Sequence, residues 1–587
     1  MTLKKLLALA LSATMLVASF TACSSSTEDT SSADDTTSSD TDVEEEEDDT
    51  DAFAFDSDDE KEENVSLGLY PGTSAEGSIT ANLGSEPTSL NTMLATYSHD
   101  FVVLNNLYTG LLELDENDNV IPGAAESWTV SDDGLTYTFT LREDIYWSNG
   151  TQLTANDFYF AWTTLLDPAT AADYAYFGFI IENAEAYYNG EVGIEELGLE
   201  VTSDFELVVT LEDPTAYAEF TFTFGSFMPV NEEFYNEVGA DNYAMEPEYT
   251  ISCGAWIMES WTHDSNIVLT KNEDFYNADL VELDELIYVM ITDTNTALNA
   301  LSAGELDIMT ITGDQLTLLE SEGQQVYSYS SGATYYLLFN HEDEIMSNLN
   351  LRKALSLSYD RDAYIATVLQ NSSIPANSFT NPGVSGSSGT SFAADVEAEY
   401  GILNYTDIEE AQAYLEVALE ELDMTLEELN AVLTYNCGDS TTSINTAAFF
   451  QEQWRVNLGI EVTVQSMTTK EQSEARTAGN YMIDFTGWGP DYNDPMTFLD
   501  MWVSDSSGNS SNFASEEYDA LVEIATTSTD LEERQAAFLE VEKIIADEVV
   551  VSNVYWSITN YTVSDKIADG FSRSTFQDMY YTYTTLN

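Results

Sequence analysis

The chain has 587 residues, with 15 Lys or Arg against 106 Asp or Glu, and a formal net charge of -91 at pH 7. Hydrophobic residues make up 43%, which is enough for a sizeable core and excludes wholesale disorder. The scarcity of cations argues against a nucleic-acid partner, because phosphate binding needs clustered Lys and Arg. Three His and three Cys leave little material for a zinc cluster or a disulfide-stapled fold.

The N-terminus has the composition of an export signal. Lys4 and Lys5 are followed by the apolar stretch Leu6–Phe20, which is too short for a comfortable permanent membrane span. Small residues then precede Cys23, a pattern that resembles a bacterial lipoprotein signal. The resemblance implies that residues 1–22 are removed and that Cys23 is lipidated; an ordinary cleaved signal peptide is the alternative.

Residues 23–75 are predicted to be a disordered tether. They are rich in Ser, Thr and acids, include the acidic run Glu44–Asp49, and contain one base, Lys61. Such a segment cannot bury enough apolar surface to offset the entropy of ordering. We interpret it as a spacer that holds a folded domain away from the membrane. Calcium binding by the acidic run is the less favoured alternative. The body that follows is also acidic, which either repels anionic solutes or reflects a salt-tolerant or acid-biased proteome.

The first half of the body begins with strand patterns. Ser78–Leu83 is a predicted strand, and Trp128–Val130 and Leu135–Leu141 are predicted to form a hairpin around Gly134. Phe205–Leu211 is a further predicted strand. A helix is predicted to begin at the capping pair Thr154 and Asp157 and to end before Pro168. Its apolar face consists of Phe158, Trp162 and Leu165.

The second half alternates helices and strands. Strands are predicted at Leu306–Ile311, Leu433–Asn436, Ile460–Val464 and Val549–Trp556. One short helix contains Ala297, Leu298 and Leu301 and ends at Gly304, and another covers Ile444–Leu458 and ends at Gly459. Two more are predicted to begin at the pairs Thr406 with Glu409 and Asp530 with Glu533, the latter with the face Ala537, Phe538, Val541 and Ile544. This order predicts α/β lobes with at least one parallel sheet.

Catalytic and metal motifs are scarce. The sequence has no G-x-S-x-G, P-loop, H-E-x-x-H or G-x-G-x-x-G pattern. His99, His263 and His341 have no ligand spacing, so surface or hydrogen-bonding roles are favoured. An enzyme is therefore unsupported, and neither a metal nor a cofactor is predicted.

Two weaker patterns have structural interpretations. Asp115 and the polar residues after it have calcium-loop spacing, but Val120 stands where such a loop needs Gly, so a polar turn is predicted. Cys253 and Cys437 could form a disulfide in an exported protein, although nothing in the sequence fixes their proximity.

Several aromatic residues lie in turn-rich segments, and the clearest of these segments is Gly487–Pro495. With two Gly, two Pro and two acids, it is predicted to be a loop that presents Trp488 and Asp491. An aromatic wall beside a carboxylate suits a ligand with an ammonium group and apolar parts. A buried Trp beside a loop-capping Asp is the alternative. The other aromatic residues of this kind are Tyr97, Tyr174, Tyr492 and Trp556.

Ordered sequence blocks extend along the whole body. They are Tyr108–Leu112, Pro122–Trp128, Asp133–Phe139, Trp147–Gly150, Thr154–Phe158, Gly254–Trp256, Asn272–Tyr276, Ala303–Ile308, Leu351–Leu355 and Trp488–Pro495. In this order they resemble the family 5 extracellular solute-binding proteins of peptide ABC importers, over about residues 78–587. The resemblance implies an α/β, type II periplasmic-binding-protein-like clamp of two lobes with an additional α+β domain. Lobe I would comprise 76–108, 231–310 and 556–587, the extra domain 109–230, and lobe II 311–555.

The resemblance also implies a peptide site between the lobes. The peptide would lie as an extended strand between Thr96, Tyr97 and Ser98 on one side and Gly487, Trp488 and Gly489 on the other. Asp491 would bind its α-ammonium group, and Tyr174, Tyr555 and Trp556 would line side-chain pockets. Where relatives bind the peptide carboxylate, this chain has the non-basic residues Asp343, Thr441 and Phe485. Arg352 and Lys353 are close in sequence but match a helix that is structural in the family.

The implied function is capture of neutral or cationic peptides and their delivery to an ABC permease and ATPase complex, without enzymatic activity. The protein would be a monomer on the outer face of a Gram-positive cytoplasmic membrane, anchored through lipid alone. The alternatives are the same fold binding a nickel chelate, an oligosaccharide or another cationic solute, and a surface sensor or adhesin without transport.

Overall fold

The computed structural model describes residues 77–587 except 388, 505, 507 and 577–578. The predicted signal, Cys23 and the tether lie outside the described residues. Within the described range, no helix combines the length and the apolar composition that crossing a membrane requires. The described residues all fall in one unit of the chain.

The largest sheet has eleven strands in the described chain and mixes parallel and antiparallel pairs. Its order is β15-β14-β16-β12-β17-β11-β1-β10-β9-β8, with β13 paired to β17 outside this path. The strands are β1 (Ser78–Asn82), β8 (Trp256–Thr262), β9 (Asn266–Lys271), β10 (Glu285–Val289), β11 (Ile308–Ile311), β12 (Val326–Phe339), β13 (Ile374–Pro375), β14 (Thr434–Cys437), β15 (Thr463–Ser466), β16 (Ile483–Trp488) and β17 (Val551–Val563). The parallel pairs that the alternating pattern predicts are β1 with β10 and β11, and β14 with β15 and β16.

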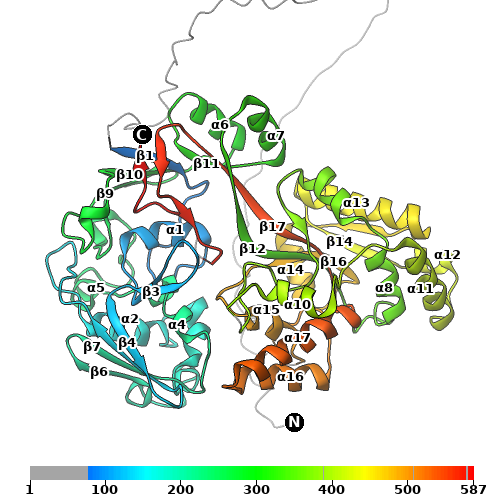
Figure 1. Cartoon of the computed structure of the whole chain (residues 1–587), viewed down its shortest axis with the longest axis horizontal. Coiled ribbons are helices and arrows are strands. Elements are labelled where there is room, and N and C mark those ends of the chain that lie inside the picture. The colour runs from blue at the N-terminus through cyan, green and yellow to red at the C-terminus, as the bar shows by residue number, and fades with distance from the viewer. Residues whose placement is uncertain (1–76, 388, 505, 507, 577–578) are drawn as a thin grey trace, which may run out of the picture. The chain divides into compact units, whose positions relative to one another are not determined.

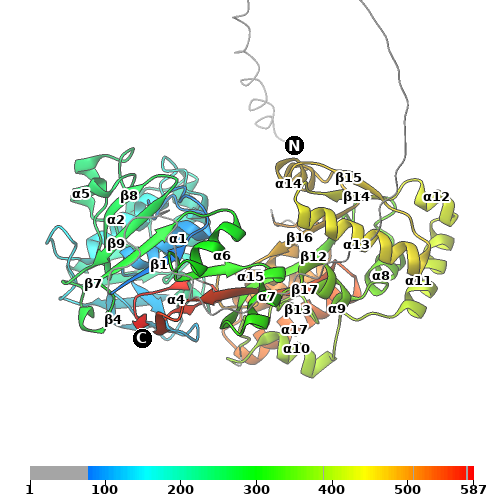
Figure 2. The same ribbon diagram turned by 90° about the horizontal axis from the view of Figure 1, so that it is seen from above.

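Two long strands in the middle of this sheet connect its two halves. β12 and β17 run antiparallel from Val326 opposite Thr562 to Leu338 opposite Val551. One end of β17 also pairs with β11, and the far end of β12 pairs with β16. Figures 1 and 2 both show β12 and β17 side by side, linking the elements near β11 to those near β16.

A separate four-stranded antiparallel sheet has the order β4-β5-β7-β6. Its strands are β4 (Ala125–Val130), β5 (Thr136–Leu141), β6 (Leu199–Ser203) and β7 (Glu206–Thr210). The hairpin predicted around Gly134 is confirmed as the β4–β5 pair. Four short strands form the two-stranded ladder β2 (Leu112–Leu114) with β3 (Val120–Pro122) and the pair β19 (Ser572–Arg573) with β20 (Met579–Tyr580). Two more, β18 (Ile567–Asp569) and β21 (Thr585–Leu586), also pair.

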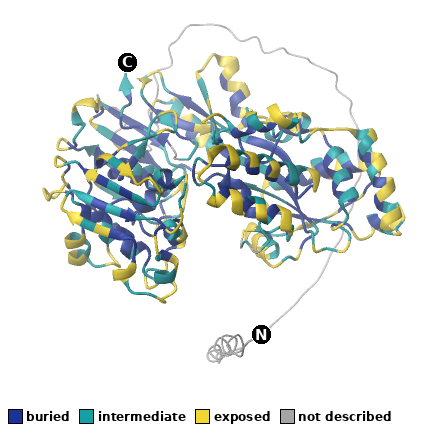
Figure 3. Cartoon of the chain, turned by 60° about the horizontal axis from the view of Figure 1, so that its bottom comes forward, coloured by how far each residue is buried: buried dark blue, intermediate teal, exposed yellow. Residues whose placement is uncertain are grey.

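Helices fill the intervals between the strands. They are α1 (Ser98–Leu107), α2 (Ala155–Leu165), α3 (Ala184–Tyr188), α4 (Ala218–Thr221), α5 (Glu232–Val238), α6 (Thr294–Ser302), α7 (Gly313–Glu322), α8 (Leu349–Leu357), α9 (Arg361–Tyr364), α10 (Phe392–Tyr400), α11 (Ile408–Glu421), α12 (Leu426–Asn430), α13 (Thr441–Leu458), α14 (Thr469–Thr477), α15 (Met496–Leu499), α16 (Glu516–Thr527) and α17 (Leu531–Asp547). Figure 3 shows buried residues along the strands and the inner helix faces, and exposed residues on the outer helix faces.

Local capping signals predict most helix ends correctly. Thr154 and Asp157 form the capping box of α2, and Asp530 caps α17 through the backbone N–H groups of residues 532 and 533. Gly459 ends α13 in the left-handed conformation, with φ 70°, which a residue without a Cβ adopts at little cost. The predicted helix and strand positions agree with the structure within a few residues, as at β7 and α6.

Three predictions at element boundaries are wrong. Asp407, not Thr406, caps α11, because the Thr406 hydroxyl instead donates a hydrogen bond to the Tyr359 carbonyl oxygen. The buried face of α17 ends on Ile545 rather than Ile544. The strand predicted to end at Trp556 continues to Val563, because β12 and β11 both supply hydrogen-bonding partners for it.

Candidate functional site

The segment Gly487–Pro495 differs from the predicted loop. Gly487 and Trp488 are the last residues of β16 and pair with Tyr335 and Thr334 of β12, so the prediction that a loop presents Trp488 is wrong. A Cβ atom at Gly487 would lie 2.7 Å from the Tyr335 ring, so glycine permits this strand pairing. The irregular part begins at Gly489 and includes Asp491.

Trp488 and Asp491 are both anchored to the start of α15. The Trp488 indole N–H donates to the Thr497 carbonyl oxygen at 2.7 Å, and the Asp491 backbone N–H donates to the Thr497 hydroxyl at 3.0 Å. These bonds fix the backbone of the segment and leave the Asp491 side chain available. Within the described chain, the Asp491 carboxylate accepts no hydrogen bond and forms no ion pair, and burial raises its pKa to about 7.

The turn before α1 approaches Asp491 from another part of the chain. The buried Asp100 carboxylate accepts hydrogen bonds from the backbone N–H groups of Thr96 and Tyr97. It also binds the backbone and hydroxyl of Thr88. Asp100 therefore fixes the Thr96–Ser98 turn through its backbone. The Thr96 and Ser98 hydroxyls make no hydrogen bond among the described residues.

A cavity of about 150 Å³ brings four of the predicted residues together: Thr96, Ser98, Tyr174 and Asp491. We call it the Asp491 cavity. Its other lining residues are Phe101, Asn105, Phe224, Gly225, Pro490 and Phe576. The sequence interpretation missed these six. Helical spacing from Ser98 could have indicated Phe101 and Asn105, whereas Phe224 and Phe576 come from distant segments and carry no local signal.

Aromatic rings form one wall of this cavity. The Phe224 ring lies 5.0 Å from that of Tyr174 and 5.2 Å from that of Phe101, centroid to centroid. Gly225 permits this packing, since a Cβ atom there would lie 2.3 Å from the Phe101 ring. Burial, reinforced by the Asp491 charge, raises the pKa of Tyr174 to about 12. An aromatic wall beside an unpaired carboxylate can bind a group that is cationic at one end and apolar at the other.

The remaining predicted site residues do not line the cavity. Tyr97 precedes α1 with 55% of its surface exposed. Tyr555 and Trp556 are buried in β17, where the Tyr555 ring stacks on Tyr335 at 4.7 Å. Trp556 is therefore in a strand and not in a turn-rich segment, contrary to the prediction, because β17 continues through it. A role for these residues, and for Gly487, Trp488 and Gly489, in ligand binding stays a prediction.

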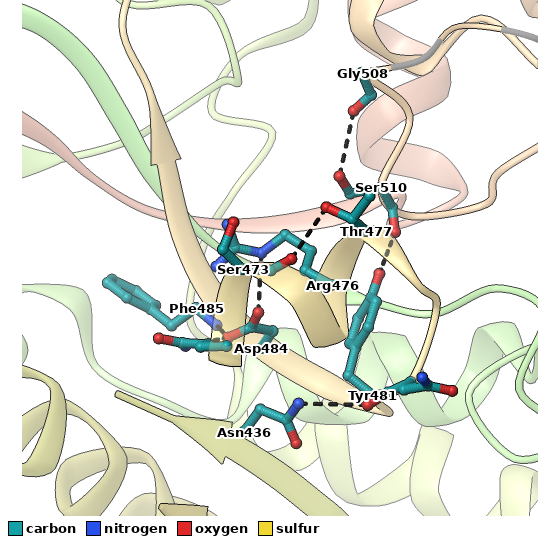
Figure 4. A network of polar contacts seen from close by, with 11 residues as sticks. Asn436, Ser473, Arg476, Thr477, Tyr481, Asp484, Phe485, Gly508 and Ser510 are labelled. Carbon is teal, nitrogen blue, oxygen red and sulfur yellow. Dashed lines mark hydrogen bonds and ion pairs between the residues drawn. The ribbon is translucent and has the colours of Figure 1, made fainter. Parts of the chain in front are cut away.

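The positions aligned with the carboxylate-binding groups of relatives have internal roles. The Asp343 carboxylate accepts from the backbone N–H groups of residues 345 and 346, and Thr441 is the first residue of α13. Beside Phe485, the Arg476 guanidinium binds the buried Asp484 at 2.9 Å (Figure 4). Arg352 donates to the carbonyl oxygens of residues 346, 548 and 549, as expected for a structural residue.

Other candidate groups also have structural partners. Asp115 accepts hydrogen bonds from the backbone of Asn117 and from both the backbone and side chain of Asn119, which confirms the predicted polar turn. Cys253 and Cys437 are buried and free, so the disulfide considered above is not formed. Among the described residues, no group of three or more His, Cys, Asp or Glu side chains is placed to hold a metal ion.

The comparisons with known proteins agree with this architecture. Residues 119–510 match the model of bacterial extracellular solute-binding proteins, family 5 Middle. The chain belongs to this family. It is 31% identical over 500 residues to the oligopeptide-binding protein OppA of Bacillus subtilis, covering 84% of this chain and 89% of the relative.

Further similarity comes from a dipeptide-binding protein and from a solved complex. The chain is 30% identical to the dipeptide-binding protein DppE of Bacillus subtilis, over 82% of this chain and 87% of the relative. The chain is also similar to the structure of Listeria monocytogenes OppA bound to peptide. The TM-score is 0.71 at 29% identity, and the match covers 87% of this chain and 99% of that one. The predicted family and the type II clamp fold class are thereby confirmed.

Proposed function

We propose that the protein binds peptides outside the cell in the Asp491 cavity and the cleft around it, and delivers them to an ABC permease for import. The observation that carries this proposal is the half-buried Asp491 carboxylate, which has no partner in the described chain and faces an aromatic wall. A peptide supplies the missing cation as its α-ammonium group. The relatives named above, including one solved with peptide bound, support the same ligand class.

Asp491 recognises the peptide through charge and hydrogen bonding. Removing a carboxylate and an ammonium from water is costly, so the pair is favourable only when both groups are well hydrogen-bonded. The Thr96 and Ser98 hydroxyls and the Asn105 amide line the same cavity and can complete the hydrogen bonds. The peptide backbone then extends between the Thr96–Ser98 turn and residues 487–489, where main-chain bonds give affinity without reading side chains.

The clamp has its hinge in β12 and β17. These strands link lobe II (311–555) to lobe I (76–108, 231–310 and 556–587), while 109–230 forms the extra domain. β12 is irregular between Ser330 and Thr334, and Gly332 lies there with φ 73°. Such a bulge allows the strands to bend. Closure of the lobes buries the peptide and stabilises the state that the permease recognises.

The ligand's carboxyl end is held without a protein cation. Arg476 is committed to Asp484 and Arg352 to backbone carbonyl oxygens, so neither is available to a ligand carboxylate. Peptides longer than the cavity, or with a solvated carboxyl end, are the ligands that this arrangement accommodates. The acidic surroundings add a preference for neutral and cationic peptides.

The rest of the chain places this clamp at the cell surface. Cys23 carries the lipid after removal of residues 1–22, and the tether holds the monomeric clamp above the outer face of a Gram-positive cytoplasmic membrane. The lipid is its only membrane attachment, and nucleic acid is not a partner. Cys23→Ser should release the protein from membranes in a cell-fractionation experiment; retention of the Cys23→Ser chain would contradict the anchor.

Calorimetric titration with an equimolar library of tri- to hexapeptides tests the binding function. A nickel–histidine chelate and an oligosaccharide mixture serve as comparators for the alternative ligands. Heat with the peptide library and none with the comparators is expected. Heat with the chelate or the sugars alone would replace the peptide assignment with that ligand class. Deletion of the permease gene should abolish uptake of the bound peptide without changing the affinity of this protein for that peptide.

A further inference from the structure

Tyr492 connects the Asp491 segment to the region of the four-stranded sheet. It directly follows Asp491, and its ring stacks on that of Tyr217 with centroids 4.1 Å apart and planes at 12°. Tyr217 precedes α4, in the region that contains β4 to β7. The Phe177 ring meets Tyr492 edge-on from that same region at 6.4 Å. The stack therefore joins two parts of the chain that lie on different sides of the Asp491 cavity.

The other attachments of this segment have a different origin. Asp494 binds Arg534 of α17, Asn493 accepts from the backbone N–H of Ser385, and Asp491 is fixed to Thr497. All these partners belong to residues 311–555, the proposed lobe II. They fix the segment to its own lobe whether or not the cleft is closed. The Tyr217–Tyr492 stack instead depends on how the extra domain and lobe II approach each other.

We propose that Tyr217 is a positioning residue for ligand capture, which acts by stacking on Tyr492 and holding the Asp491 segment against the opposite wall. This inference rests on the proposed function and adds to it a contact that sets how long the ligand stays bound. Tyr217 does not line the Asp491 cavity, so its effect is transmitted through Tyr492. The stack forms within the protein itself, and it therefore favours the closed state with or without ligand.

Loss of the Tyr217–Tyr492 stack should change how much of the protein is closed. A contact made only in the closed state raises the closed fraction and tightens ligand binding by the same factor, as long as the open state predominates. Buried aromatic pairs of this geometry correspond to about a three- to tenfold factor in an equilibrium constant. Since ligand leaves from the opened protein, most of this factor should be found in the dissociation rate.

The test combines peptide dissociation with a distance measurement. Stopped-flow dissociation of the tightest peptide from the library is compared among wild type, Tyr217→Ala, Tyr217→Phe and Tyr146→Ala. Tyr146 lies in the same region, with 41% of its surface exposed and no ring contact among those found in the described chain, and it is the matched control. Fluorescence energy transfer between dyes at Ile194→Cys and Ile524→Cys, in a Cys23→Ser background, reports closure. Cys253 and Cys437 are buried at 1% and 3% exposure and should not be labelled.

Tyr217→Ala should raise the dissociation rate about three- to tenfold and lower energy transfer in the peptide-free protein. Tyr217→Phe, which keeps the ring, should stay within about twofold of wild type, and Tyr146→Ala should match wild type. An unchanged rate and unchanged energy transfer in Tyr217→Ala, or an equal change in Tyr146→Ala, would overturn the proposal. If Tyr217→Ala fails to fold, Tyr217→Leu keeps most of the volume without the stack and is judged by the same outcomes.

The two proposals fail in different ways. If no peptide binds to wild type, the proposed function is wrong, and energy transfer in the peptide-free variants still decides whether Tyr217 controls closure. If peptide binds to wild type and Tyr217→Ala behaves as wild type, the function stands and the positioning role of Tyr217 is wrong.

Discussion

Asp491 and Asp494 lie in the same segment after β16, and their surroundings differ. The Asp494 carboxylate receives both terminal nitrogens of Arg534, at 2.6 and 2.8 Å, and the Arg534 Nε–H donates to the Ala525 carbonyl oxygen. The Asp491 carboxylate has no such partner in the described chain, and burial raises its pKa to about 7. Both carboxylates need a cation as partner. The fold supplies Arg534 to Asp494, whereas Asp491 is left for a cation from a ligand.

This difference separates a structural residue from a binding residue without reference to sequence similarity. A buried bidentate pair maintains the fold, because either ion alone would be left without compensation. An unpaired, half-buried carboxylate such as Asp491 makes the empty protein less stable and becomes favourable only when a ligand ammonium arrives.

Arg534→Met should destabilise the protein strongly. The substitution keeps the apolar length of the side chain but leaves Asp494 buried without a cation, which costs about 3–5 kcal/mol in comparable buried pairs. Urea unfolding followed by circular dichroism measures the change. Arg455→Met is the matched control, because the Arg455–Glu452 pair is exposed and its loss should change the stability little. Similar losses in the two variants would contradict the structural role of the Arg534–Asp494 pair.

Asp491→Asn should weaken binding of a peptide with a free N-terminus by about 10- to 100-fold, because the amide keeps the shape and loses the charge that pairs with the ammonium. Equilibrium titration measures the loss. Asp173→Asn is the control. Asp173 is exposed and directly precedes the cavity residue Tyr174, so water screens its charge and the change should stay within about twofold. Equal losses in both variants would indicate that general acidity, rather than Asp491, attracts the ligand.

Peptide affinity should rise with pH between 6 and 7.5 by up to about tenfold, as Asp491 with a pKa of about 7 loses its proton. Above about pH 8 the affinity should fall again as the peptide ammonium deprotonates. Titration of one peptide across this range measures the profile in buffers of constant ionic strength. The rising limb should be absent from Asp491→Asn. A rising limb retained in that variant would assign it to another group.

Without ligand, Asp491→Asn should stabilise the protein at pH 8, by less than about 4 kcal/mol, because the partial exposure of the carboxylate reduces the effect of its raised pKa. The pKa of Asp491 is raised to about 7 in the folded protein, against about 3.9 in the unfolded chain. The folded state therefore binds more protons between these values, and wild-type stability decreases as pH rises from 4 to 7. Urea unfolding at several pH values should show the advantage of the variant vanishing near pH 4. A variant that is less stable than wild type at pH 8 would show that the carboxylate has a structural partner.

The sequence predicted features that depend on neighbouring residues. The β4–β5 hairpin, the Thr154 capping box and the end of α13 at Gly459 each follow from a few adjacent residues. Thr406 and Asp407 are both competent caps, and only the position of the Tyr359 carbonyl oxygen decides between them. Similarly, β17 continues past Trp556 because β11 and β12 are there to pair with it.

The site was predictable in part for the same reason. The resemblance indicated Asp491, Thr96, Ser98 and Tyr174, which do meet in one cavity. It could not indicate that Arg534 would compensate Asp494 and leave Asp491 unpaired, since that depends on how α17 packs against the segment. Phe224 and Phe576 also contribute to the cavity only through tertiary packing.

The most direct measurement of the central claim is a thermodynamic cycle between the ligand ammonium and Asp491. One peptide, with its N-terminus free or acetylated, is titrated calorimetrically against wild type and Asp491→Asn. If Asp491 binds the α-ammonium, acetylation should weaken binding to wild type by at least about tenfold and binding to the variant by less than about twofold. Equal weakening of both proteins by acetylation would show that the ammonium is recognised elsewhere and would contradict the account.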